Sequence, residues 1–267
     1  MIKIIHIKNY IKNYFKNVKF FSFILFSPLN NKDWNKISYT KSHFHKGEEY
    51  HKKFDNLPGR KMIWEIEKKI IIKFLKKKKI ISHLDFASGS GRISKLLEKK
   101  SQKQYLIDSS NKMLNHAKKI LKNPIIINKD FTKVKIKKKF DLITAFRFFP
   151  NAEPHLRKKA VKFISKNLKK NGFLIFNNHR NFWSLPYIIR RFTFRSDGFG
   201  MTHSEIKDLL NSNRLKICDY RSIGYFTDKE KSKIIFWPII EIMESFLFKK
   251  NLKNRLGYNV IYFLKKY

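Results

Sequence analysis

The sequence predicts an α/β protein with a doubly wound, mostly parallel sheet of seven strands, preceded by an N-terminal helical extension. Between residues 80 and 180, short apolar runs alternate with segments that carry apolar residues at spacings of three and four. This alternation is typical of a parallel sheet with helices on both of its faces. The first apolar run leads into a cluster of small residues, 87–91, where a strand can turn sharply into a helix.

The chain shows no Gly/Ser-rich linker and no internal repeat. We therefore expect one main domain over residues 58–267 and an extension over residues 1–57, which could act as a lid. The main domain begins with a helix over 58–75, because Pro58 suits a first helical turn and apolar residues follow on one face. A run of four lysines, Lys76–Lys79, ends this helix near the negative end of its dipole.

The remaining elements follow from the same patterns. Strands are expected at 80–86, 104–108, 124–128, 140–145 and 173–178, with helices starting near Ile93, Met113 and Leu156 and a turn over 169–172. After residue 180 the patterns weaken to a helix capped by Thr202 or Ser204, a strand over 215–221, an apolar helix over 234–248 and a strand over 258–264. Cys218 lies in an alternating apolar run, so we expect it to be a small core residue.

Composition narrows the class of protein. With 42% hydrophobic and 15% aromatic residues, the 267-residue chain is too apolar to be disordered. Its net charge of +40 has two open interpretations: a polyanionic partner, such as nucleic acid or an anionic membrane, or the compositional drift of an AT-rich genome, since the lysines are spread along the whole chain. A single cysteine and the lack of any apolar run of ~20 residues favour a cytoplasmic protein, with peripheral membrane contact left open through the Lys-rich first 30 residues.

The segment 83–93 carries the clearest chemical signal. A buried strand ends in Asp85, and small residues follow at positions 87, 89 and 91, so that a ligand can approach the backbone closely. Asp108 ends the next strand, 23 residues further on, which suits a carboxylate that accepts hydrogen bonds from ribose hydroxyls. Open α/β sheets bind ligands outside the carboxyl ends of such strands.

Two cofactor classes fit this segment. Residues 89–94 form a loose GxGxxS pattern, which is close to the dinucleotide-binding fingerprint. Asp85 argues against a dinucleotide, because a carboxylate beside the loop would repel a pyrophosphate. S-adenosylmethionine carries an ammonium and a sulfonium group and no phosphate, so an acid favours it.

Five segments, in the correct order, resemble the motifs of the class I (Rossmann-like) S-adenosylmethionine-dependent methyltransferases. The segments are 84–92, 106–114, 128–131, 140–145 and 168–174, and the likeness covers about residues 58–180. Two departures are visible. Ala87 stands where many members have their first glycine, which we expect to be tolerated if its φ stays negative, and Asn171 replaces the usual Pro or Gly before Gly172.

The resemblance implies a cofactor half, 80–180, and a substrate-side half, 181–267, with S-adenosyl-L-methionine as the cofactor. It assigns a role to each matching position. The methionine moiety would be framed by Asp85, Ala87, Gly89 and Gly91, with the backbone at Ala145 and Phe146 facing its ammonium end and Arg60 able to meet its carboxylate. The ribose would be held by Asp108, with Ser109 and Met113 beside the adenosine. The adenine would be contacted by Asp130 and Phe131.

The acceptor is less well defined by the residues. Arg147 could hold an anionic acceptor, with Phe146 lining an apolar pocket, or it could instead pair with Glu153. His179 follows the fifth strand and is a weak candidate for a general base, which is needed only if the acceptor is protonated. The histidines at 43, 45 and 51 lack zinc-site spacing, so we expect no metal.

The sequence therefore favours S-adenosylmethionine-dependent methyl transfer to a small-molecule or lipid-like acceptor. Three alternatives remain open at this point. They are an RNA methyltransferase that uses the basic surface, a non-catalytic polyanion- or membrane-binding protein on the same fold, and an NAD(P)-dependent oxidoreductase.

Overall fold

The computed structural model describes residues 52, 58–192, 200–226, 237–250 and 254–267. The expected N-terminal extension, the histidines at 43, 45 and 51, and the first residues of the helix expected over 234–248 lie outside the described residues.

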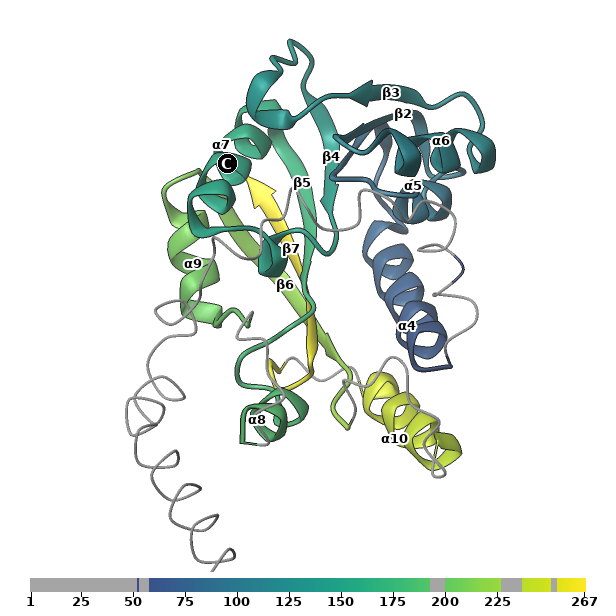
Figure 1. Cartoon of the computed structure of the whole chain (residues 1–267), viewed down its shortest axis with the longest axis vertical. Coiled ribbons are helices and arrows are strands. Elements are labelled where there is room, and N and C mark those ends of the chain that lie inside the picture. Colours follow the sequence, from purple (N-terminus) through teal and green to yellow (C-terminus); the bar gives the residue numbers. More distant parts are fainter. Residues whose placement is uncertain (1–51, 53–57, 193–199, 227–236, 251–253) are drawn as a thin grey trace, which may run out of the picture.

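A seven-stranded sheet forms the middle of the molecule, as predicted, with the strand order β3-β2-β1-β4-β5-β7-β6 (Figure 1). The first five strands are parallel, and β7 runs antiparallel to both of its neighbours. The strands are β1 (Ile80–Phe86), β2 (Ser101–Asp108), β3 (Ile125–Asn128), β4 (Phe140–Ala145), β5 (Leu168–Asn178), β6 (Leu215–Ile223) and β7 (Asn259–Lys266). The sheet is therefore mostly parallel, with two antiparallel pairings at one end.

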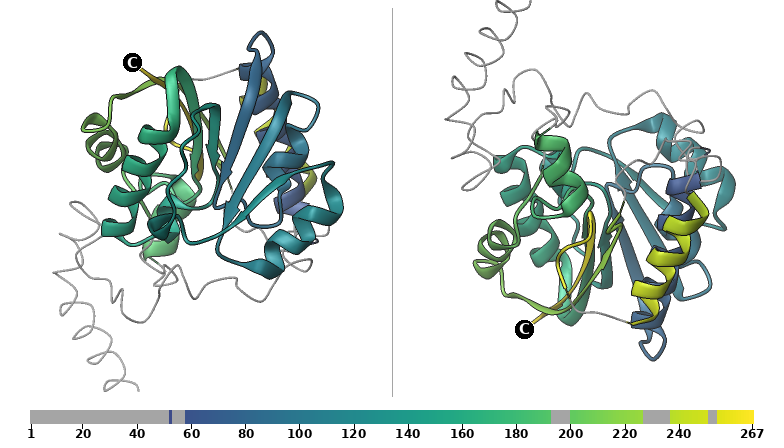
Figure 2. Two further views of the ribbon diagram at one scale, coloured as in Figure 1. Left: turned by 90° about the horizontal axis from the view of Figure 1, so that it is seen from above. Right: turned by 90° about the horizontal axis from the view of Figure 1, so that it is seen from below.

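Helices cover both faces of the sheet. The views from above and below place α7 and α9 on one side and α4 and α6 on the other (Figure 2). The helices are α4 (Pro58–Leu75), α5 (Arg92–Leu96), α6 (Asn111–Ile120), α7 (Pro154–Asn167), α8 (Leu185–Phe192), α9 (His203–Asn211) and α10 (Trp237–Lys249), with short 3₁₀ turns η2 (Phe131–Lys133) and η3 (Phe149–Asn151). Sequence patterns missed α8 and both 3₁₀ turns.

The two covered faces explain the apolar runs in the middle of the sheet. Successive side chains of a strand point to opposite faces. In β5, Leu174 and Phe176 join the core under α7 and α9, while Ile175 between them joins the core under α4. In β7, Tyr262 and Phe263 divide in the same way. A strand buried on both faces shows no polar alternation, which is the pattern of β4 and of most of β7, whereas β3 and β6 are partly exposed.

Strand β5 differs from the sequence prediction because its backbone is irregular. The turn expected at 169–172 lies inside β5, which begins at Leu168 and shifts register against β4 between the pairs Phe140–Leu168 and Leu142–Phe173. Asn171 takes up the irregularity with a φ of 63°, which Asn tolerates better than most residues.

Cys218 is exposed, so its prediction as a core residue was wrong. The register of β6 against β7 shifts between Ile217 and Asp219, which leaves Cys218 as the extra residue of a bulge. Its Sγ lies 3.2 Å from the carbonyl oxygen of Phe263, to which it donates a hydrogen bond. Thr202 caps α9 as expected, since its hydroxyl accepts from the backbone N–H of Glu205.

Candidate functional site

The loop between β1 and α5 turns within a few residues at the carboxyl edge of the sheet. Ser88 donates its backbone N–H to the carbonyl of Ile107 at 3.1 Å, and Gly91 donates to the carbonyl of Ser88 at the same distance. Ala87, Gly89 and Gly91 all have positive φ, at 52°, 53° and 79°. The condition under which alanine was expected to be tolerated, a negative φ at Ala87, is therefore not met, because the turn has a left-handed residue at the position where many of the methyltransferases it resembles have glycine.

The two glycines of the loop have different surroundings. A Cβ added to Gly91 would lie 2.9 Å from the Cβ of Ala117 and 3.2 Å from Cδ1 of Leu121, so its missing side chain lets α5 pack against α6. A Cβ added to Gly89 would meet no atom within 4 Å. Gly89 thus borders open space, and its bare backbone leaves room for a ligand.

Asp108, the last residue of β2, holds the loop from the other side. Its Oδ2 accepts the backbone N–H of Gly89 at 2.8 Å, and its Oδ1 accepts the N–H of Ser110 at 2.8 Å. Burial raises the pKa of this carboxyl group above its ordinary value. Each carboxylate oxygen has two lone pairs, so Asp108 can still accept hydrogen bonds from hydroxyls of a ligand.

A pocket opens beside Asp108. It combines an aromatic wall, in which the rings of Phe86 and Phe131 meet at 4.9 Å, with polar groups at the ends of β2 and β3. Its lining residues are Phe86, Ala87, Ile107, Asp108, Ser109, Lys129, Asp130, Phe131, Phe148 and Leu156. Five predicted cofactor residues, at positions 87, 108, 109, 130 and 131, therefore lie around one pocket.

Asp130 also shapes the pocket wall. Its Oδ1 accepts the backbone N–H of Thr132 at 2.8 Å and the hydroxyl of Thr132 at 2.9 Å, which caps the 3₁₀ turn that carries Phe131. The carboxylate thus fixes the backbone from which the aromatic ring projects.

Asp85 lies beneath the loop and is only 2% exposed. Its Oδ2 accepts from the N–H and the hydroxyl of Ser94 at 3.2 and 2.8 Å, and its Oδ1 accepts from the hydroxyl of Thr144 at 2.8 Å. Burial raises the pKa of Asp85 to about 7, since the cost of desolvation outweighs these hydrogen bonds. The Thr144 hydroxyl is also 2.8 Å from Nε2 of His83, whose pKa burial lowers to about 3. This chain of contacts ties β1, α5 and β4 together.

The other predicted site residues lie away from the lining of this pocket. Gly91, Met113, Ala145 and Phe146 are buried, Arg60 is half-buried on the first turn of α4, and His179 is 5% exposed just after β5. Arg147 follows β4 with a φ of 58°. Its backbone N–H donates to Oδ1 of Asn177 at 2.7 Å, and its carbonyl accepts from Nδ2 of Asn151 at 2.7 Å.

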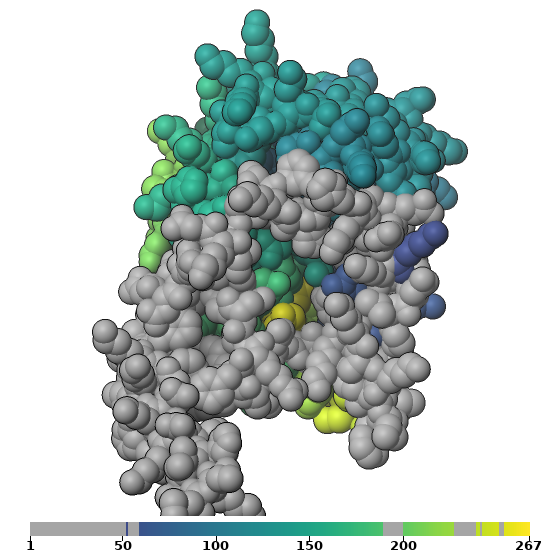
Figure 3. All heavy atoms as spheres, viewed as in Figure 1, coloured from purple at the N-terminus to yellow at the C-terminus, as the bar shows by residue number. Residues whose placement is uncertain are grey.

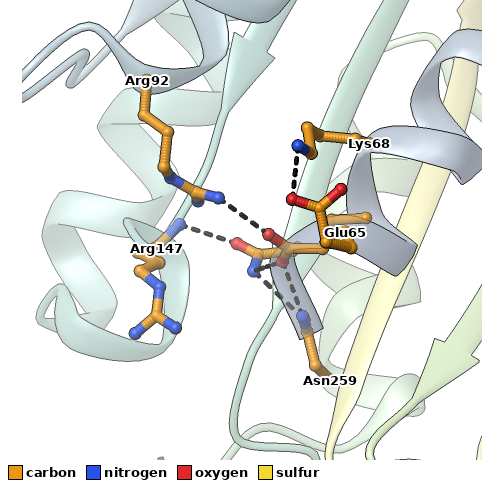
Figure 4. A network of polar contacts seen from close by, with 7 residues as sticks. Glu65, Lys68, Arg92, Arg147 and Asn259 are labelled. Carbon is orange, nitrogen blue, oxygen red and sulfur yellow. Dashed lines mark hydrogen bonds and ion pairs between the residues drawn. The ribbon is translucent and has the colours of Figure 1, made fainter. Parts of the chain in front are cut away.

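Sequence reasoning missed a buried polar cluster next to the loop, which we call the Glu67 network (Glu67, Arg92, Asn177 and Asn259). Glu67 of α4 is 1% exposed, and its Oε2 lies 3.0 Å from Nη1 of Arg92 in a buried ion pair. Nδ2 of Asn259 donates to the other oxygen, Oε1, at 2.7 Å. Figure 4 shows Arg92 and Asn259 reaching this carboxylate from two sides.

Asn177 links the network to the segment after β4. Its Nδ2 donates to Oδ1 of Asn259 at 3.1 Å, and its Oδ1 accepts the backbone N–H of Arg147 (Figure 4). Behind Arg92, the ring of Trp64 lies 3.9 Å from the guanidinium carbon. One signal could have revealed this cluster: Glu67 falls on the buried face of α4 with Ile63 and Ile70, where a lone carboxylate requires a partner.

In the described part of the chain, no group of three or more His, Cys, Asp or Glu side chains is placed to hold a metal ion. Over the same residues, no helix combines the length and apolarity needed to cross a membrane.

Comparison with known proteins identifies the fold. Residues 84–176 match a family model described as a methyltransferase domain. The chain has the class I methyltransferase fold. The matched range spans β1 to β5 and includes the whole loop and pocket described above. None of the curated proteins matches the sequence.

Several solved structures share this fold. An S-adenosylmethionine-dependent methyltransferase from Clostridium acetobutylicum is 18% identical, covers 82% of this chain and 98% of its own, and has a TM-score of 0.58. A possible histamine N-methyltransferase from Thermotoga maritima is 16% identical, with coverages of 82% and 94% and a TM-score of 0.57. N-methyltransferase NodS from Bradyrhizobium japonicum, in complex with S-adenosyl-L-homocysteine, is 13% identical, with coverages of 80% and 90% and a TM-score of 0.55.

Proposed function

We propose that this chain is an S-adenosylmethionine-dependent methyltransferase that acts on a small-molecule or lipid-like acceptor. The observation that carries the proposal is the Asp108 carboxylate, which ends β2 beside the open backbone of Gly89 and a pocket walled by Phe131. The complex of NodS with S-adenosyl-L-homocysteine supports a cofactor of this type on this fold.

The residues around the pocket fit this cofactor. Asp108 would accept hydrogen bonds from the ribose hydroxyls, through the carboxylate lone pairs that do not accept from the N–H groups of Gly89 and Ser110. Phe131 would lie against the adenine ring, with Asp130 and Ser109 at the polar side of the pocket. Asp108 and Asp130, the two acids that line the pocket, favour a cationic ligand over an anionic one.

Backbone hydrogen bonding in the loop disfavours a dinucleotide. A dinucleotide loop offers free N–H groups to a pyrophosphate. Here the N–H groups of Ser88, Gly89 and Gly91 donate to Ile107, Asp108 and Ser88, respectively. The N–H of Ser94 in α5 donates to Asp85. These four N–H groups therefore already have acceptors within the protein.

S-adenosylmethionine supplies a methyl group on a sulfonium, which passes to a nucleophilic atom of the acceptor by in-line displacement. The protein contributes position and orientation, which can be worth ~7–11 kcal/mol of the barrier. Asp85 would act through Ser94 and Thr144 by fixing the loop rather than by touching the acceptor. Arg147 remains our candidate for holding an anionic acceptor, and His179 for accepting a proton from it.

The acceptor class rests on the chemistry of the site and on one neighbour. The possible histamine N-methyltransferase acts, by its name, on a small molecule. In this chain, buried aromatic side chains such as Phe146 and Phe148 follow β4, next to Arg147. This mixture suits an acceptor with an apolar body and an anionic group.

Calorimetric titration with S-adenosylmethionine, with NADH in a parallel cell, tests the proposal. We expect heat from S-adenosylmethionine alone, and an affinity at least ~10-fold weaker in Asp108→Asn, which corresponds to about 1.4 kcal/mol. Asp141→Asn is the control, because Asp141 also accepts hydrogen bonds, two from Ser82 and one from Lys169, but near the opposite edge of the sheet. Its affinity should equal that of the wild type.

Two results would contradict the proposal. A folded wild-type protein that releases no heat with S-adenosylmethionine excludes the cofactor. Binding that Asp108→Asn and Asp141→Asn weaken equally would mean that the pocket beside Asp108 is not the cofactor site.

A further inference from the structure

The helix α10 (Trp237–Lys249) exposes apolar side chains and buries an acidic one, which is the reverse of the pattern in an ordinary surface helix. Ile239, Ile242, Met243 and Phe246 follow one another at spacings of three, one and three residues and so share one face. They are exposed by 54%, 68%, 41% and 54% of their surface. Glu244, on the other side of the helix, is 1% exposed. The helix thus buries its carboxylate and shows large apolar side chains to the solvent.

Backbone contacts to Glu244 fix this orientation. Its Oε2 accepts the N–H of Gly224 at 3.1 Å, and its Oε1 accepts the N–H of Phe226 at 3.0 Å. Phe248 packs against the core cluster under α4. Rotating the helix to hide its apolar face would break these hydrogen bonds and leave buried polar groups without partners, at a large cost. The outward apolar face is therefore a stable feature of the fold.

Two basic side chains lie at the end of this apolar face. Lys249 and Lys250 at the end of the helix are exposed, and Nζ of Lys250 lies 4.6 Å from the ring centre of Phe246. The whole chain carries a net charge of +40. In Figure 3 the yellow-green atoms of this part of the chain reach the surface at the lower edge of the molecule.

The positive charge of the protein distinguishes among three possible partners for the apolar face: a second copy, a nucleic acid and a membrane. A second copy would bring two strongly positive molecules together, which like-charge repulsion opposes. A nucleic acid would satisfy the charge but would leave the apolar side chains in water. An anionic bilayer surface satisfies both, because acyl chains take up the apolar face while lysines contact the headgroups.

We propose that the outward face of α10 docks this protein on an anionic membrane surface. At 13 residues the helix is about 20 Å long, too short to span a bilayer but sufficient to lie in the interface. The proposal does not depend on the proposed methyl transfer.

Vesicle flotation tests this docking. Wild-type protein should float with vesicles of phosphatidylglycerol and phosphatidylcholine, and far less with phosphatidylcholine alone. The double variant Ile242→Ser and Phe246→Ser should bind the anionic vesicles at least ~10-fold more weakly, because it removes two large apolar contacts without changing the charge. The control is Ile72→Ser with Ile81→Ser, two large apolar side chains on α4 and β1 that are also exposed, by 40% and 43%. It should bind like the wild type.

A second measurement is independent of the stability of the double variant. In a Cys218→Ser background, which removes the single cysteine, Met243→Cys can carry a polarity-sensitive fluorophore. Anionic vesicles should shift its emission to the blue, while the same label at Ile72→Cys should not respond.

Three outcomes would overturn the proposal. Equal binding by both double variants would show that charge alone attracts the protein, as it would any polyanion, RNA included. Equal binding to neutral vesicles would remove the charge argument. Self-association that disappears in the α10 variant, with no vesicle binding, would assign the face to a second copy.

Discussion

Two polar regions meet at the carboxyl edge of the sheet, and they are built over very different sequence distances. In the glycine loop region (residues 85–94 with Asp108), the hydrogen bonds of the two acids to the loop and to α5 join residues 9 and 19 positions apart. In the Glu67 network, hydrogen bonds to the Glu67 carboxylate join residues 25, 110 and 192 positions apart. The first region is a local motif, whereas the second exists only once the chain has folded.

Arg92 belongs to both regions. It follows Gly91 and starts α5, so its backbone is part of the glycine loop, while its side chain pairs with Glu67 of α4. The loop is thus held in front by Asp108 and behind by a buried ion pair. We expect the local motif to place the cofactor and the long-range contacts to supply the rigidity that orientation requires.

The largest expected effect comes from breaking the long-range region. Glu67→Gln leaves the buried guanidinium of Arg92 without its counter-charge, and breaking a buried pair from one side typically costs ~3–5 kcal/mol. We expect the free energy of unfolding, measured by urea denaturation, to fall by about 3 kcal/mol. Adding Arg92→Met should restore part of the loss, because the unpaired charge is then gone.

Glu65→Gln is the matched control for this prediction. Glu65 lies two residues away on the same helix, pairs with Lys68 at 2.6 Å and is 47% exposed (Figure 4). An exposed ion pair contributes at most ~1 kcal/mol. If the two variants lose equal stability, the Glu67 network is not the anchor that its burial suggests.

The same distinction explains what the sequence could predict. The ranges expected for β1 and β4 agree with the structure, because a strand buried on both faces is visible as a continuous apolar run. Five pocket residues were found because they belong to local motifs at strand ends. Glu67 and Asn259 were missed because nothing within their own segments shows that they meet.

Backbone irregularities were a second source of error. Cys218 lies in an apolar alternating run, but a one-residue bulge changes which side chains face the core. Residue type alone does not reveal a bulge. Nor does it reveal that the loop forces a left-handed conformation on Ala87.

An effect of about the same size should appear in the pH dependence of the glycine loop region. The pKa of Asp85 is near 4 in the unfolded chain and is raised to about 7 in the folded protein. At pH values between these two, Asp85 is protonated when folded and charged when unfolded, so its contribution to stability falls as pH rises. His83, with a pKa lowered to about 3, takes up a proton only when unfolded, so its contribution rises with pH until about 6.5. The two slopes nearly cancel in the wild type.

Asp85→Asn removes the falling slope, because the amide resembles the protonated acid and does not titrate. Relative to the wild type, the variant should gain roughly 3 kcal/mol of stability between pH 4 and pH 7, from ~1.36 kcal/mol per pKa unit. Urea denaturation of both proteins at several pH values measures this difference. Parallel stability curves would show that the proton on Asp85 is not retained on folding, and that burial has not shifted its pKa as described.

The smallest effect concerns the strain at Ala87. A left-handed alanine costs ~1–2 kcal/mol, and glycine removes that cost while adding ~0.4–1 kcal/mol of unfolded-state entropy. We therefore expect Ala87→Gly to stabilise the protein by about 0.5 kcal/mol, visible as a small rise in Tm. Ala145→Gly, at the end of β4 where φ is not positive, should destabilise it by about 0.5–1 kcal/mol. Stability changes of opposite sign in the two variants would locate the strain at Ala87 in the loop. A loss of stability in both variants would mean that the Ala87 methyl group, packed beside Phe86 and Phe131, contributes more stability than its positive φ costs. Alanine in place of glycine at this position would then provide a packing contact rather than a strained turn.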